Sequence, residues 1–217
     1  MQKKNQRNFF IAISILVTFV LWTISLCFVD VQPVGPQGSS VGFAMLNCFV
    51  HNRIGVHMAL YQLTDWLGLV PLGSGLGFAV LGAVQWCKRR KLRYVDFSIL
   101  ALGGFYIVLM AVYLFFENFV INYRPILIDG FLEASYPSST TMLVMCVMST
   151  AITQLRTRIN GRILRHCVTA VLAAFAAFMV VGRLISGVHW ITDIIGGMFL
   201  SCGLVMLYHS VCCLDVK

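Results

Sequence analysis

The chain has 217 residues, of which 59% are hydrophobic and only 11% are charged, and its mean hydropathy is +0.86. A soluble domain carries roughly a quarter of its residues as charged side chains, so this composition excludes an ordinary soluble protein. The net charge of +8 could suit nucleic acid. The basic residues, however, lie in short blocks between apolar runs, as membrane topology requires, and we expect no nucleic acid partner.

Six apolar runs are long enough to cross a bilayer, because ~20 helical residues span its hydrocarbon core. The first, Phe9–Val29, is too long for a cleaved signal peptide, so residues 1–30 are expected to hold an uncleaved anchor. Residues 31–65 combine a loop-like composition with an apolar stretch and are expected to form an outer segment along the membrane surface. The other five expected helices, within residues 66–211, are Trp66–Trp86, Val95–Phe116, Ser138–Leu155, His166–Val181 and Trp190–Tyr208.

These elements predict an all-α fold, an integral membrane six-helix bundle that forms one domain over residues 1–217. Thirteen of the 16 Lys and Arg residues fall on one side of such a bundle. The positive-inside rule then predicts a multi-pass protein of the cell membrane with both termini in the cytoplasm. The three remaining basic residues, Arg53, Arg124 and Arg183, are left on the outer side, where topology alone does not explain them.

Three polar segments meet the outer boundary in this topology. They contain Arg124, then Ser138 and Ser139, and finally Arg183 with His189 and Asp193. His189 and Asp193 are four residues apart and would share one helix face if a helix begins just before His189, as Ser186 and Gly187 suggest. A carboxylate beside an imidazole fixes its tautomer and makes the free nitrogen a better base or nucleophile. Two arginines and two helix starts on one side predict a phosphate-binding site next to a histidine.

The same residues resemble the type 2 phosphatidic acid phosphatase superfamily, which also includes the vanadium haloperoxidases. Its pattern is K-x6-R-P, then P-S-G-H, then S-R-x5-H-x3-D, and the resemblance covers roughly residues 90–210. The spacing of the third block is intact, whereas the first two blocks match in part. The matching residues are Arg124, Pro125, Pro137, Ser138, Arg183, His189 and Asp193.

The resemblance implies roles for these residues. His189 would be the nucleophile and form a phosphohistidine, and Asp193 would orient it. Arg124, Arg183, Ser138, Ser139 and nearby backbone amides would hold the phosphoryl oxygens. No metal and no cofactor is implied. The partner would be a lipid or polyprenyl phosphate in the membrane, and the oligomeric state is left open.

Two departures from the pattern change the expected chemistry. Glu117 stands where the family has lysine, and Thr140 stands where it has the histidine that protonates the leaving group. Threonine cannot do this at neutral pH. Another group could supply the proton, with Glu117 as the first candidate and Glu133 and His57 as others. Alternatively, a diphosphate leaving group needs little help, or the chain binds lipid phosphate without turnover.

The sequence therefore predicts a membrane phosphatase that hydrolyses a lipid phosphate or prenyl diphosphate through a phosphohistidine on the non-cytoplasmic side. Two alternatives remain: a lipid phosphotransferase that moves a headgroup between lipids, and a non-catalytic lipid-phosphate-binding relative. The segment 31–65 is expected to cover the site.

Overall fold

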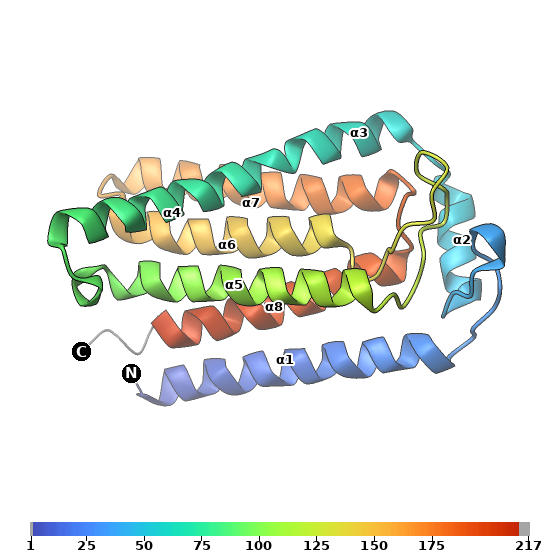
Figure 1. The fold of residues 1–217 in the computed structure, drawn as a ribbon, viewed down its shortest axis with the longest axis horizontal. Helices are drawn as coiled ribbons and strands as arrows, with labels where there is room; N and C mark the ends of the chain where they lie inside the picture. The colour runs from blue at the N-terminus through green and yellow to red at the C-terminus, as the bar shows by residue number, and fades with distance from the viewer. Residues whose placement is uncertain (1, 213–217) are drawn as a thin grey trace.

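The computed structural model describes residues 2–212, and its long helices run side by side along one axis (Figure 1). Strands are absent from this part of the chain, which confirms the expected all-α class. In chain order the elements are α1 (Gln2–Phe28), the 3-10 turn η1 (Pro36–Gly38), α2 (Ala44–Ile54), α3 (Met58–Leu67), α4 (Leu69–Arg89), the 3-10 turn η2 (Leu92–Tyr94), α5 (Phe97–Asn118), α6 (Ser139–Arg158), α7 (Arg162–Ile185) and α8 (Ile191–Cys212).

Five helical runs within residues 2–212 are long and apolar enough to cross a membrane. They are α1, the combined run of α3 and α4, α5, α7 and α8. The second run therefore begins at Met58 rather than at Trp66, the start expected from the sequence. Gly68, which joins α3 to α4, has helical dihedral angles (φ −59°, ψ −19°), so the chain passes from one helix to the next without a loop.

Helix α6 corresponds to the expected span Ser138–Leu155, but it is not among the five apolar runs. It lies in the middle of the bundle, where it packs against α4, α5, α7 and α8. Its polar side chains are bonded inside the protein: Thr150 lies 3.2 Å from the Tyr106 hydroxyl, and Gln154 donates to the Ser98 carbonyl (3.0 Å). A helix shielded from lipid by its neighbours needs less apolar surface.

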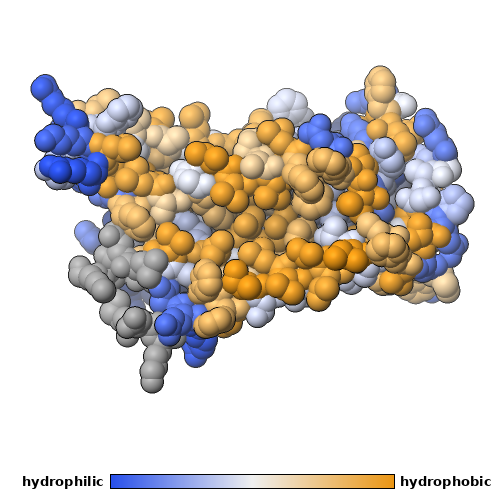
Figure 2. Space-filling model, turned by 60° about the horizontal axis from the view of Figure 1, so that its bottom comes forward, coloured by the Kyte–Doolittle hydropathy of each residue, from blue (hydrophilic) through white to orange (hydrophobic). Residues whose placement is uncertain are grey.

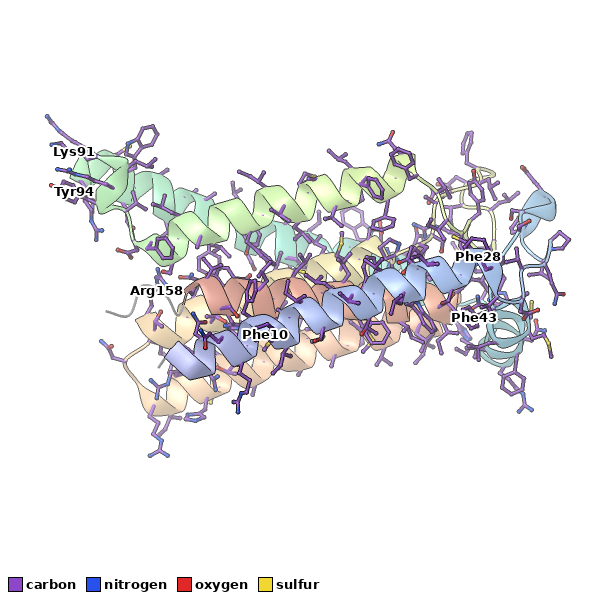
Figure 3. All side chains as sticks on the ribbon, turned by 90° about the horizontal axis from the view of Figure 1, so that it is seen from below. Phe10, Phe28, Phe43, Lys91, Tyr94 and Arg158 are labelled. Atoms are coloured by element: carbon purple, nitrogen blue, oxygen red, sulfur yellow. The ribbon has the colours of Figure 1, made fainter. Side chains whose placement is uncertain are left out.

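Charge and hydropathy separate the molecule into a band and two ends. Figure 2 shows an apolar band across the middle of the visible face and hydrophilic residues at both ends. Figure 3 places Lys91, Tyr94 and Arg158 at one end and Phe28 and Phe43 at the other. The first end holds the loops from α4 to α5 and from α6 to α7, which carry the basic blocks of the sequence. The expected grouping of these basic loops on one side is thus present in the fold.

At the opposite end, α7 turns into α8 through the residues 186–190. Gly187 has φ +69°, a left-handed conformation that ends α7, and a Cβ atom at this position would lie 2.0 Å from the Gly55 carbonyl oxygen. Helix α8 begins only at Ile191, so the helix start expected just before His189 is wrong. His189 lies in the turn, and Asp193 lies in the first turn of α8.

We expect Gly187→Ala to lower stability, because left-handed strain alone costs about 1–3 kcal/mol and the added Cβ also meets a backbone oxygen. Thermal unfolding in detergent measures the effect. Gly104→Ala is the matched control, since the position lies within α5 and a Cβ there meets open space. Equal melting temperatures for the two variants would contradict this account of the turn.

Candidate active site

His189 is held by a buried hydrogen-bond chain that starts at its Nδ1 atom. The direct distance from His189 Nδ1 to Asp193 Oδ2 is 3.9 Å, too long for a hydrogen bond. The hydroxyl of Ser135 fills this gap: its Oγ lies 3.0 Å from Nδ1 and 2.5 Å from Oδ2. All three residues are buried. The expected histidine–carboxylate pair is therefore present, but a serine mediates it.

This chain of contacts fixes the imidazole tautomer. The Ser135 hydroxyl has one proton and donates it to the Asp193 carboxylate, so it can only accept from the ring. Nδ1 of His189 therefore carries the ring proton. Nε2 is left with a free electron pair, and it is buried without a hydrogen-bond partner. A neutral imidazole with a free Nε2 can act as a base or as a nucleophile.

Asp193 is itself fixed from two sides. The Trp190 backbone N–H donates to Oδ2 (3.0 Å), and the Asn122 side-chain amide donates to Oδ1 (3.3 Å). The bond to Trp190 reaches from the third residue of α8 back to the residue before the helix, as the acidic residue of a capping box does. The carboxylate also lies at the positive end of the helix dipole. The helix start thus positions the carboxylate that orients the histidine.

Arg183 enters the site from the last turn of α7, and its side chain is 3% exposed. Its Nη2 atom donates to Thr140 Oγ1 (2.6 Å) and to Asp65 Oδ1 (3.0 Å). The guanidinium also lies over the ring of Tyr61, 4.7 Å from its centroid. Two of these partners, Tyr61 and Asp65, belong to α3. Residues 58–65, which the sequence assigned to an outer segment along the membrane surface, instead belong to a helical run long enough to cross a membrane, and two of them contact Arg183.

Arg124 approaches from the loop between α5 and α6. This loop folds back on itself: the Arg124 N–H donates to the Glu133 carbonyl (3.1 Å), and the Ser135 N–H donates to the Asn122 carbonyl (2.9 Å). The pairing brings Arg124 and Ser135 to the same place, although eleven positions separate them. The Arg124 Nε atom lies 3.1 Å from Glu133 Oε2, and its guanidinium lies 5.8 Å from the Tyr61 centroid. The two arginines therefore share one aromatic ring.

Ser138 and Ser139 stand at the start of α6. Ser138 is the residue before the helix, as expected, but its hydroxyl makes no capping bond and is buried without a partner. Its backbone N–H donates to the Asp193 carbonyl (3.1 Å), which ties the start of α6 to the start of α8. Five buried polar atoms of these site residues lack hydrogen-bond partners: Arg124 Nε and Nη1, Ser138 Oγ, Arg183 Nε and His189 Nε2. Buried polar atoms are normally paired, so such a cluster indicates a polar ligand.

The electrostatics of the site keep the histidine neutral. Burial lowers the pKa of His189 well below its usual value, and the positive charges of Arg124 and Arg183 lower it further. An additional proton on the ring would be a third positive charge in a buried site. The imidazole is therefore neutral at pH 7, with its electron pair available at Nε2. The two guanidiniums that oppose protonation of His189 are the ones that lie over the Tyr61 ring, at 5.8 and 4.7 Å from its centroid.

The three groups suggested as substitutes for the missing acid lie in different places. Glu117 is exposed at the end of α5 and lines a small hollow together with Ser135 and Ser139. Glu133 pairs with Arg124. His57 is exposed, and its Nε2 lies 3.0 Å from the Ile54 carbonyl oxygen, on the connection between α2 and α3.

Sequence reasoning missed four residues that contact the expected site residues: Tyr61, Asp65, Asn122 and Ser135. Asn122 and Ser135 lie close in sequence to Arg124 and to Ser138, so proximity to the matched blocks was a usable signal. Tyr61 and Asp65 had no such signal, because α3 is brought to Arg183 only by tertiary packing.

Comparison with known proteins agrees with this geometry. The family model described as the PAP2 superfamily matches residues 101–212, more than half of the chain. The chain belongs to the PAP2 superfamily. No curated protein matches it. A solved structure, "Crystal structure of the first transmembrane PAP2 type phosphatidylglycerolphosphate phosphatase from Bacillus subtilis", superposes with a TM-score of 0.64 over 95% of this chain and 97% of that chain, at 16% identity.

The family resemblance noted in the sequence is thereby confirmed, and the structural match shows a shared membrane fold. Because members of the PAP2 superfamily are phosphatases, membership of this family supports a membrane lipid phosphatase.

We expect Arg124→Gln to raise the pKa of His189, because it removes one of the two positive charges that oppose protonation of the ring. Nitrogen-detected NMR titration of selectively labelled histidine measures the shift. Arg53→Gln is the control: Arg53 lies on α2, over the ring of Phe49, and is not among the charges that lower the pKa of His189. A histidine pKa that is identical in both variants would show that Arg124 does not face the imidazole.

Proposed function

We propose that this protein hydrolyses a lipid phosphate or polyprenyl diphosphate through a phosphohistidine formed on His189. The observation that carries the proposal is the buried, unpartnered Nε2 of a neutral His189 beside two guanidiniums. Membership of the PAP2 superfamily supports the same chemistry. Both guanidiniums keep a buried donor without a hydrogen-bond partner, Arg124 Nη1 and Arg183 Nε, and phosphate oxygens are suitable acceptors for them.

In the proposed reaction Nε2 of His189 attacks phosphorus and the bond to the leaving oxygen breaks. Arg124, Arg183 and the hydroxyl of Ser138 hold the non-bridging oxygens, together with the backbone at Ser139. Catalysis then depends on groups that stabilise the charge developing on the phosphoryl oxygens. Asp193 acts through Ser135 and stabilises the ring as it becomes positive. Water releases phosphate from the histidine in the second step.

A large apolar cavity beside the site supports a lipid substrate. It has a volume of about 570 Å³ and lies between α4, α5 and α6. Apolar side chains such as Leu72, Leu76 and Leu109 line most of it, and Thr140 and Asp65 line its polar end. A ligand that places its phosphate on Arg183 can extend an alkyl or prenyl chain into this cavity.

The orientation in the membrane is also part of the proposal. The basic loops lie at one end of the bundle and the candidate site at the other. With the basic end in the cytoplasm, both termini are cytoplasmic and the site opens to the outer leaflet.

The alternatives differ in the fate of the phosphoryl group. A phosphotransferase would use the same histidine and replace water with the hydroxyl of a second lipid. A non-catalytic binder is favoured by one observation: Thr140 takes the place of the family histidine and contacts Arg183. That arrangement keeps the phosphate-binding arginine but removes the usual proton donor.

We expect His189→Ala to abolish phosphate release, by on the order of 10³-fold or more, because no other nucleophile replaces the ring. The purified protein in detergent is assayed against a panel of lipid phosphates and diphosphates. His166→Ala is the matched control, since this exposed histidine lies near the start of α7, at the opposite end of that helix from Arg183. Lipid binding without turnover by the unmodified protein would favour the binder, and turnover that needs an acceptor lipid would favour the transferase.

We expect Ser135→Ala to lower kcat by about 10- to 100-fold, the usual effect of losing a group that orients a reactive histidine. The substitution breaks both bonds that join His189 to Asp193. Ser135→Thr keeps the hydroxyl and should retain most activity. A merely structural role of Ser135 predicts the same loss of activity in both variants. A larger loss in Ser135→Ala than in Ser135→Thr therefore supports a role in orienting His189, and kcat and KM are measured separately.

A further inference from the structure

The place where a leaving group would be protonated can be located from the two ends of the ligand. In a lipid phosphate the leaving oxygen joins the phosphoryl group to the lipid tail. If the proposed function holds, the phosphate lies on Arg183 and the tail in the cavity between α4, α5 and α6. The leaving oxygen then lies where the guanidinium meets the mouth of that cavity.

Two polar side chains contact Arg183 and also line the cavity: Thr140 and Asp65. Both accept hydrogen bonds from the same nitrogen, Nη2, at 2.6 Å and 3.0 Å. Their oxygen atoms are therefore at most 5.6 Å apart. Thr140 occupies the position of the family's proton-donating histidine, so the carboxyl of Asp65 stands next to the place from which that proton would come.

The other acidic residues near the site do not have this placement. Glu133 pairs with Arg124 and does not line the cavity. Glu117 lines an adjoining and much smaller hollow, of about 10 Å³, and does not line the cavity itself. Among the residues that line the 570 Å³ cavity, Asp65 is the one carboxylic acid. Its side chain is 61% exposed, whereas the Arg183 side chain that it contacts is 3% exposed.

We propose that Asp65 is the general acid that protonates the leaving group, in place of the histidine that Thr140 has replaced. The proposal rests on the proposed phosphatase function. It assigns a catalytic role to α3, which lies outside the residues matched by the family. The acid is thus supplied by a different helix from the one that carries the family's proton donor.

The proton moves three times over the two chemical steps of the reaction. In the structure the Asp65 carboxylate pairs with Arg183. In the proposed reaction phosphate oxygens replace it as partners of the guanidinium, and the freed carboxylate takes up a proton before the attack. When His189 attacks, the phosphorus–oxygen bond breaks and Asp65 gives its proton to the leaving oxygen. In the second step a water molecule attacks the phosphohistidine, its proton returns to Asp65, and phosphate leaves.

A pair of substrates with matched tails tests this role. One is a long-chain alkyl phosphate and the other is a phenyl phosphate with the same alkyl chain on the ring. Loss of a general acid typically slows a reaction 10²–10⁴-fold when the leaving group needs the proton. We expect Asp65→Asn to show a loss of this size with the alkyl ester and less than about tenfold loss with the phenyl ester, since a phenol leaves without help.

Three further variants complete the experiment. Asp129→Asn changes an exposed carboxyl in the loop between α5 and α6 and should leave both rates unchanged. Asp65→Asn combined with Thr140→His should recover part of the alkyl ester activity, because the family's acid is restored. Glu117→Gln tests the acid first suggested by the sequence. All proteins are compared as monodisperse samples in detergent.

The outcomes distinguish a failure of the Asp65 proposal from a failure of the proposed phosphatase function. Equal loss with both esters in Asp65→Asn would show that Asp65 only holds Arg183, and no loss would show that it is not needed; either result overturns the proposal. A selective loss in Glu117→Gln alone would assign the acid to Glu117 instead. Phosphate release that survives His189→Ala would contradict the proposed function itself, whatever Asp65 does.

Discussion

The hydrogen-bond chain from His189 through Ser135 to Asp193 is the constraint on which the rest of the site depends. It needs three separate segments: the turn after α7, the loop before α6, and the first turn of α8. Each segment is fixed locally, by Gly187 in the turn, by the pairing of the folded loop, and by the Trp190 N–H at the helix start. Because the chain is buried, water cannot replace any of its bonds, and the ring keeps one tautomer with a free Nε2.

The sequence predicted the class of fold, the grouping of the basic loops and the meeting of His189, Arg124 and Arg183. The lengths of the apolar runs and the placement of the charges supported the first two predictions, and the residue spacing within the family motifs supported the third. The start of α8 was misjudged because Ser186 and Gly187 resemble a helix start, whereas Gly187 ends the preceding helix. Helix α6 shows the limit of composition: it is shielded by neighbouring helices, so its hydropathy does not report its position in the bundle.

Helix α3 shows why the site could not be completed from the matched blocks. It contributes Tyr61 beneath both guanidiniums and Asp65 on Arg183, although no spacing links it to them. The contact arises because Gly68 lets α3 continue into α4 and because the backbone of His57 bonds to Ser186 at the turn after α7. Long-range packing of this kind leaves no periodic or spacing pattern in the sequence.

The charge balance of the site sets how it can bind an anion. Each guanidinium is paired with a carboxylate, Arg183 with Asp65 and Arg124 with Glu133, and both carboxylates are far more exposed than their partners. Two buried cations beside a neutral imidazole would otherwise repel one another. Under the proposed function, phosphate binding is therefore an exchange, in which the ligand takes over the arginines and the carboxylates are released toward water. The exchange favours a doubly charged phosphate over weaker anions, and it frees a carboxyl beside the leaving oxygen at the moment when a proton is needed there.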